Sequence, residues 1–289
     1  MLHVTNGDKA VEVLRKARLP GAFLPWRDVL HEGPVDAALA PEALSALRAR
    51  FIASCGWGVA AEVEAQFRER DAMLAHASGE DEVVLWFEHD LYDQLQLIQL
   101  LAWFAGHPHP RLTLVCEPEY LGTMTPARAA ALFQARRPVR PEQLRTGLAA
   151  WQAFGSASPH KLLQVKAHSL RFLAAALRRL LQEFPWTGDG LSRLEREVLE
   201  ALEFGPLGLD DLFRAVQSHE DPMYLGDTVL LWHLERMARE GLLLRIGEHW
   251  TASGKPRGRR EARWIGGVRL DADTPWRWDP ASGRLVALA

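Results

Sequence analysis

The sequence predicts an α/β N-terminal domain with a parallel, Rossmann-like sheet, a helical middle segment and a C-terminal winged-helix-like domain. Two patterns lead to this prediction. Over residues 1–125, short apolar runs alternate with segments of helical periodicity, an order that favours a parallel sheet with right-handed crossovers. Beyond residue 188, three helical segments precede a β-hairpin, which is the order of elements in a winged helix.

The composition is that of an ordinary globular protein. Of the 289 residues, 48% are hydrophobic and 25% are charged, and the formal net charge is -3 at pH 7. That charge gives no whole-protein argument for binding nucleic acid or a membrane, so only local patches bear on the question. No signal-like or membrane-spanning apolar run is present, and Cys55 and Cys116 are isolated. We therefore expect a cytoplasmic protein without a membrane partner, whose oligomeric state the sequence does not indicate.

Four strands are predicted in the first domain, at residues 2–5, 22–25, 83–87 and 112–116. The third, Val83–Phe87, is apolar throughout, as expected of a strand that is covered on both faces. Helices are predicted after the first strand, over residues 41–76 with a break at the Gly-Trp-Gly of residues 56–58, and after the third strand. Residues 26–34 contain polar groups, a Gly and a Pro without helical period, and we interpret them as a functional loop.

The remaining chain divides into a helical segment (126–187), the winged-helix-like domain (188–267) and a β-hairpin extension (268–289). Thr125 before Pro126 is a helix start, and leucines between residues 170 and 181 form a stripe of helical period. Ser192 and Glu195 form a capping box. The third helix of the winged-helix-like domain is predicted to begin at an Asp227 cap.

Polar side chains follow each predicted strand. The carboxyl ends of parallel strands share one edge of a sheet, and ligands of open α/β sheets bind there. We therefore expect these side chains to converge on one site. The expected catalytic residues are Asp8, Asp28, His31, Glu88 and Asp90. The expected ligand-binding residues are His3, Asn6, Gly7, Trp26, Arg27, Glu32, His89, Asp93 and Gln94.

A divalent metal is the candidate cofactor, because carboxylates and imidazole are suitable ligands for it. The residues that would bind it are Glu88, His89, Asp90 and Asp93. Successive residues of a strand alternate between faces, so either Glu88 and Asp90 or His89 alone would face one ligand. The alternative is structural. Asp90 would cap the following helix, and Glu88 would pair with an arginine such as Arg27.

Two further stretches are open to both functional and structural interpretations. The turn Asn6-Gly7-Asp8 is either an anion cradle at a helix N-terminus, with Lys9 adding positive charge, or a plain Asp N-cap. His31 with Glu32 is either a general base oriented by a carboxylate or part of a rigid turn.

The predicted wing, residues 245–263, is basic, with six Lys or Arg against two Glu. Its Arg257, Arg259 and Arg260 could contact phosphates, so nucleic acid binding without sequence preference is one expectation. The approach to the third helix, residues 219–227, is acidic, which argues against sequence-specific DNA binding. Docking of a protein partner is the other interpretation of this domain.

Five blocks of the chain resemble a bacterial family known only as the domain of unknown function numbered eighteen thirty-five, with its C-terminal companion domain. The blocks are LHVTNGD, WRDVLHEGPV, LWFEHDLYDQLQL, EFPWTGDGLSRLEREVLEAL and WRWD. The resemblance covers almost the whole chain and implies no established activity. Members usually have Ser after the Asn-Gly-Asp, whereas this chain has Lys9, so a Gly-Asp-Ser nucleophile is absent.

Two hypotheses about function follow. In the first, the α/β domain binds a phosphorylated or otherwise anionic small molecule and acts as a hydrolase or transferase. In the second, the same crevice senses a ligand, and the winged helix relays the signal to DNA or to a protein partner.

Overall fold

The first half of the chain builds a sheet of five strands in the order β2-β1-β4-β5-β6. The structure is a computed structural model and describes residues 1–288. All strands are parallel except the edge strand β6, which runs antiparallel to β5. Thr5 lies in register with Pro25 on one side and Trp86 on the other, so neighbouring strands end at one level. The strands are β1 (Leu2–Thr5), β2 (Ala22–Pro25), β4 (Val83–Phe87), β5 (Leu112–Cys116) and β6 (Arg137–Pro138).

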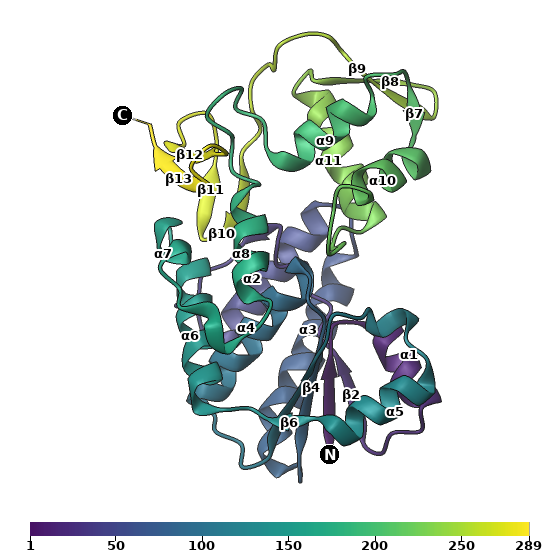
Figure 1. The fold of residues 1–289 in the computed structure, drawn as a ribbon, viewed down its shortest axis with the longest axis vertical. Helices are drawn as coiled ribbons and strands as arrows, with labels where there is room; N and C mark the ends of the chain where they lie inside the picture. The colour runs from purple at the N-terminus through teal and green to yellow at the C-terminus, as the bar shows by residue number, and fades with distance from the viewer. Residues whose placement is uncertain (289) are drawn as a thin grey trace.

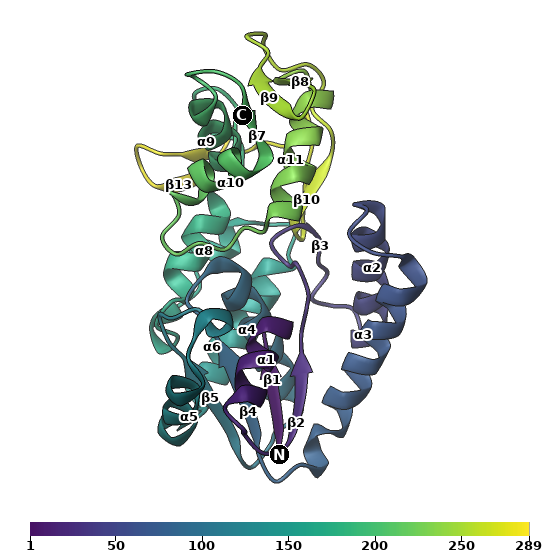
Figure 2. The same ribbon diagram turned by 90° about the vertical axis from the view of Figure 1, so that its right-hand side faces the viewer.

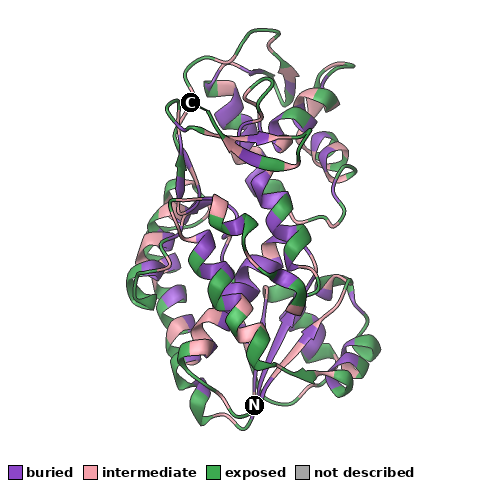
Figure 3. Ribbon diagram, turned by 60° about the vertical axis from the view of Figure 1, so that its left-hand side comes forward, coloured by how far each residue is buried: buried purple, intermediate pink, exposed green. Residues whose placement is uncertain are grey.

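Helices cover both faces of this sheet (Figure 1). β4 is fully buried, and its side chains alternate between two cores. Val84 and Trp86 pack with α1 and α5, whereas Leu85 and Phe87 pack with α4, α6 and α8. Buried residues gather where the helices face the sheet, and exposed residues lie on the outer faces (Figure 3). The covering helices are α1 (Asp8–Lys16), α4 (Leu91–Gly106), α5 (Pro126–Ala135), α6 (Pro141–Phe154) and α8 (Leu173–Leu181).

A helical hairpin of α2 (Pro41–Ser54) and α3 (Ala60–Ala75) stands along one side of the molecule (Figure 2). It has a small core of its own, which includes Ile52 and Phe67. The hairpin also supplies two buried arginines, Arg48 and Arg70, whose partner Asp28 lies in the loop after β2. The remaining short helical segments are α7 (His160–Leu163) and the 3-10 turns His76–Gly79, Leu121–Thr123 and Ala167–Ser169.

Residues 188–262 form a C-terminal module with a separate core, above the carboxyl ends of the sheet strands in Figure 1. Its three short strands pair antiparallel in the order β7-β9-β8. The capping box between Ser192 and Glu195 is present at its first helix. Its elements are α9 (Arg193–Ala201), β7 (Leu207–Gly208), α10 (Leu209–Gln217), α11 (Asp227–Arg239), β8 (Leu243–Ile246) and β9 (His249–Ala252).

The last residues of the chain return to the N-terminal half. β10 pairs in parallel with β3 in the loop after β2, and Trp278 and Leu285 belong to the core of the sheet. The C-terminal end is therefore packed against the first domain. The elements involved are β3 (Gly33–Pro34), β10 (Arg263–Gly266), β11 (Val268–Leu270), β12 (Trp276–Asp279) and β13 (Arg284–Ala287).

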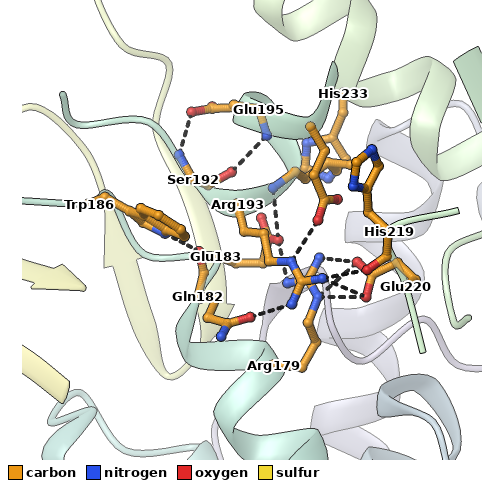
Figure 4. A network of polar contacts seen from close by, with 12 residues as sticks. Arg179, Gln182, Glu183, Trp186, Ser192, Arg193, Glu195, His219, Glu220 and His233 are labelled. Carbon is orange, nitrogen blue, oxygen red and sulfur yellow. Dashed lines mark hydrogen bonds and ion pairs between the residues drawn. The ribbon is translucent and has the colours of Figure 1, made fainter. Parts of the chain in front are cut away.

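A buried network of charges joins the C-terminal module to α8 (Figure 4). Arg179 of α8 donates to both carboxylate oxygens of Glu220, at 2.8 and 2.9 Å, and to Glu183 at 2.7 Å. Glu183 is only 4% exposed and also lies near Arg263. Every charge in this network has a partner of opposite sign, as buried charges require.

The four predicted parallel strands, the helices between them and the C-terminal hairpins are confirmed. Two details are corrected. Residues 126–187 are not all helical, because Arg137–Pro138 adds an edge strand, a position that tolerates proline. Asp227 is the first residue of α11 and Gly226 is its N-cap. Residues 126–187 share the core of the sheet.

Within residues 1–288, no helix combines the length and apolar character needed to span a membrane.

Candidate functional site

A pocket of about 930 Å³ lies between the carboxyl edge of the sheet and the C-terminal module. β1 pairs with β2 on one side and with β4 on the other, so the strand order reverses at β1. Ligands of open α/β sheets bind at such a reversal. On the sheet side the pocket is lined by Asn6, Gly7, Asp8, Lys9, His31, Glu88, Asp90, Tyr92, Asp93 and Tyr120.

Three carboxylates form the polar centre of this pocket, and we call Glu88, Asp90 and Asp93 the carboxylate cluster. Each offers an oxygen, and these oxygens lie within 4.8 Å of one another. The three residues are only 5%, 3% and 1% exposed. Among residues 1–288, no Lys or Arg forms an ion pair with any of them. Within the described chain, the cluster therefore has no cationic side chain to compensate its charge when the acids ionise.

Backbone and amide groups hold the carboxylate cluster in place. Asn6 at the end of β1 donates to Glu88 and to Asp93, both at 2.9 Å. The N–H of Glu88 donates to Asp93 at 2.6 Å, and the N–H of Leu121 donates to Glu88 at 2.7 Å. The cluster thus depends on β1, β4, the start of α4 and the segment after β5, which only the folded sheet brings together.

Burial and mutual repulsion favour the protonated forms of these acids. Burial and the charge of Asp90 raise the pKa of Glu88 to about 7. Burial raises the pKa of Asp90 to about 6. Burial, with Asp90 and Glu88 nearby, raises the pKa of Asp93 well above its usual range. A bound cation would reverse these shifts, because it replaces the protons as the counter-charge.

The N-terminus of α1 lies beside the carboxylate cluster. Gly7 is its N-cap, and no side chain caps this helix end. The first N–H groups of a helix have no partner within the helix and attract anions. A side chain at Gly7 would meet open space, so the backbone is accessible from the pocket. The anion-cradle interpretation therefore fits this turn better than the Asp N-cap, since Asp8 is already inside the helix.

His31 is the one expected catalytic residue whose side chain is buried at the pocket without a partner. It is 4% exposed, and neither Nδ1 nor Nε2 has a hydrogen bond. Its ring packs edge-on against Tyr224, with centroids 5.2 Å apart at 88°. Burial lowers its pKa to about 4, so the ring is neutral at pH 7.

Of the two interpretations of this loop, the one in which Glu32 orients His31 is not what the structure has. Glu32 instead accepts a hydrogen bond from His233 of α11 at 2.7 Å and lies near Arg263. Asp28 is also outside the pocket, because it is fully buried and bound by Arg48. Both carboxylates are thus structural partners of buried cations.

Several expected ligand-binding residues lie elsewhere. His3 uses both ring nitrogens within the protein, accepting from Trp86 and contacting the carbonyl of Pro20. Trp26 is buried and donates to Gln99. Arg27 does not pair with Glu88, since it binds Asp8 at the rim of the pocket. These three side chains are therefore engaged within the protein, and of the three Arg27 lies at the rim of the pocket.

The alternation expected at the end of β4 is present. Glu88 and Asp90 face the pocket, whereas the ring of His89 packs against Phe172 and Tyr120. Asp90 also caps α4 by accepting from the N–H of Asp93 at 3.0 Å, so its structural and cluster roles coexist. Gln94 lies behind the cluster and donates to the carbonyl of Glu88 at 2.7 Å.

Comparison with protein-family models, curated proteins and solved structures finds no match in any of the three. The resemblance described above therefore stays a prediction, and the function must be inferred from the site itself.

The opposite side of the pocket was not anticipated from the sequence. The C-terminal module supplies it with Phe213 of α10, Met223, Tyr224 and Leu225 of the following loop, and Val229 of α11. We call these five residues the apolar wall. Local sequence gave no signal for them, because their role arises only where the module meets the sheet.

The side chains of the predicted wing, residues 245–263, also differ from expectation. Arg257 pairs with the buried Glu195 and with Glu240, and Arg260 donates to the carbonyl of Gly190. Arg263 is only 4% exposed. The expectation that Arg257 and Arg260 contact phosphates is therefore wrong, because these side chains neutralise or satisfy internal groups.

Proposed function

We propose that the protein binds a divalent cation at Glu88, Asp90 and Asp93 and acts as a hydrolase or transferase on a phosphorylated or otherwise anionic small molecule. The observation that supports the proposal most is the carboxylate cluster itself. Its three buried acids have converging oxygens and, within residues 1–288, no neighbouring Lys or Arg as ion-pair partner. Carboxylates are the preferred ligands of Mg²⁺, Ca²⁺ and Mn²⁺.

The surrounding groups suit such a reaction. A bound cation would polarise a phosphoryl or carbonyl oxygen. The free N–H groups of α1 at Gly7 would hold an anionic oxygen of the substrate. Neutral His31 borders the same pocket and its ring nitrogens make no hydrogen bond within the described part of the protein, so it is the candidate proton acceptor for a water or substrate hydroxyl that reaches them.

Calorimetric titration of the purified chain with Mn²⁺ tests the proposal. We expect binding near one equivalent for the wild type, loss of that binding in Asp93→Asn, and unchanged binding in Glu119→Gln. Glu119 is a matched control, because it is a surface carboxylate paired with Arg128 after β5. A melting curve shows whether Asp93→Asn is folded. No Mn²⁺ binding by folded wild type would overturn the proposal, whereas hydrolysis of phosphate esters that requires both Mn²⁺ and His31 would support it.

The alternative is a ligand-sensing protein that signals through a winged helix. Two observations favour it. The C-terminal module has the element order α9-β7-α10-α11-β8-β9 with strand order β7-β9-β8, as in winged helices, and it supplies one side of the pocket. A ligand would therefore contact both parts of the chain. Cation-dependent ligand binding without turnover, together with a changed affinity for duplex DNA, would favour the sensor over the enzyme.

A further inference from the structure

The pocket has two chemically different sides. The carboxylate cluster, the N-terminus of α1 and His31 form a polar side at the sheet edge. The apolar wall faces it from the C-terminal module, with Phe213 and Val229 on two different helices. Met223 is 43% exposed although most large apolar side chains of the chain are buried. The pocket is therefore bordered by apolar side chains of the module as well as by the charged groups at the sheet edge.

The size of the pocket exceeds what an inorganic anion needs. Its volume is about 930 Å³. Pockets for small organic molecules occupy about 300 to 1,000 Å³, whereas a single water takes about 30 Å³. A phosphate group at the polar side would leave most of this volume, and the whole apolar wall, to the rest of the ligand.

Aromatic side chains make up much of the lining. Tyr92, Tyr120, Phe213 and Tyr224 come from four different segments and all border the pocket. Tyr224 is held by two neighbours, since Arg179 lies 5.0 Å from its ring centre and His31 contacts it edge-on. Fixed aromatic rings favour flat aromatic ligands through stacked or edge-to-face contacts.

We propose that the ligand is a phosphate ester of an aromatic group of nucleobase size. Its phosphate lies at the carboxylate cluster and the N-terminus of α1, and its aromatic group lies against the apolar wall. This inference rests on the proposed function, because the carboxylate cluster in its ionised form repels a phosphate dianion unless a cation neutralises it. Lys9 in the first turn of α1 adds positive charge at the same end of the pocket.

Titration calorimetry with three probes tests the substrate class. Inorganic phosphate, glycerol 3-phosphate and adenosine 5′-monophosphate are each titrated into the full chain with saturating Mn²⁺ and again without it. We expect adenosine monophosphate to bind at least tenfold more tightly than glycerol 3-phosphate, and only with Mn²⁺. Phe213→Ala and Val229→Ala should each weaken the nucleotide roughly five- to tenfold, the effect of removing one buried apolar contact.

The controls separate this inference from the proposed function. The same two variants should bind Mn²⁺ and inorganic phosphate like the wild type, which also shows that they are folded. Phe204→Ala removes a fully exposed phenylalanine of the same module, 98% exposed, and should change nothing. Equal affinity for the two esters, or no ester binding despite Mn²⁺ binding, would overturn the substrate class and leave the cation site standing. Absence of Mn²⁺ binding would overturn both.

Discussion

Nε2 of His233 lies 2.7 Å from Oε1 of Glu32, and both side chains are buried although 201 positions separate them in the chain. This contact ties α11 of the C-terminal module to the loop that follows β2. Arg236 contacts the other ring nitrogen of His233 at 3.1 Å and also binds Glu195 at 2.9 Å. This buried contact between His233 and Glu32 thus helps to fix the C-terminal module relative to the sheet, and with it the pocket between them.

The first prediction concerns Glu32→Gln. Burial, which would raise the pKa of Glu32, is outweighed by His233 and Arg263, and the pKa falls to about 2. A lowered folded-state pKa contributes stability above the unfolded pKa and loses it as pH falls. We expect the variant to lose on the order of 3 kcal/mol at pH 7, since one partner of a buried pair is removed.

Urea unfolding followed by circular dichroism at pH 7, 4 and 3 measures this. The difference between wild type and variant should shrink as pH falls from about 4.5 toward 2. Glu248→Gln serves as the control, because that side chain is 91% exposed. A difference that is independent of pH would show that Glu32 is not ionised in the folded protein.

The second prediction concerns the carboxylate cluster without metal. The pKa of Glu88 is raised to about 7 and that of Asp90 to about 6. A raised folded-state pKa contributes stability below the unfolded pKa and loses it as pH rises through the folded value. Between pH 5 and pH 8 the metal-free protein should therefore lose stability, by up to about 1.4 kcal/mol per pH unit for each proton released.

Melting temperatures in chelator across this pH range test the effect. Mn²⁺ should raise the melting temperature at pH 8 far more than at pH 5, where protons compete for the same oxygens. Asp93→Asn in chelator should lose less stability than the wild type between pH 5 and pH 8, because the variant has one fewer buried acid that must ionise. A wild-type melting temperature that rises steadily from pH 5 to pH 8 in chelator would contradict the predicted ionisation.

The third prediction concerns the leucine stripe of α8. Leu177 is 4% exposed and belongs to the core shared by the sheet, α4 and α6. Leu177→Ala should cost roughly 2 to 5 kcal/mol, the range for emptying a packed leucine site. Arg178→Ala, at the exposed neighbouring position, should change stability by about 0.5 kcal/mol or less. Equal denaturation midpoints for the two variants would show that the stripe contributes little.

The fourth prediction compares two arginines of the predicted wing, residues 245–263. Arg257 pairs with the buried carboxylates Glu195 and Glu240, whereas Arg259 is exposed. Arg257→Ala should destabilise the chain by on the order of 3 kcal/mol, because it leaves buried charge less compensated. Arg259→Ala should leave stability unchanged within about 0.5 kcal/mol.

A mobility-shift titration at low salt separates stability from nucleic acid binding. If duplex DNA binds, Arg259→Ala and Lys255→Ala should weaken it to a similar degree for every sequence, since exposed cations neutralise phosphates without reading bases. Strong binding confined to one sequence would contradict this. Binding that Arg259→Ala leaves intact would place the contact elsewhere on the module.

Local sequence patterns determined the order of strands and helices. The apolar run of β4, the capping box at Ser192 and the leucines of α8 each predict an element from neighbouring residues alone. The convergence of Asn6, Glu88 and Asp93 also followed from sequence, because strand ends of a parallel sheet share an edge. Apolar periodicity and the order of elements along the chain can be read from short segments without the rest of the protein.

Tertiary structure alone decided which polar residues face the pocket. Asp28 and Glu32 follow β2 as predicted, yet they bind Arg48 and His233 from distant helices and leave His31 unpartnered. The apolar wall around Tyr224 likewise exists only where the C-terminal module meets the sheet. A buried charged group pairs with whichever complementary side chain packing brings to it, and that partner lies elsewhere in the sequence, so no local pattern identifies it.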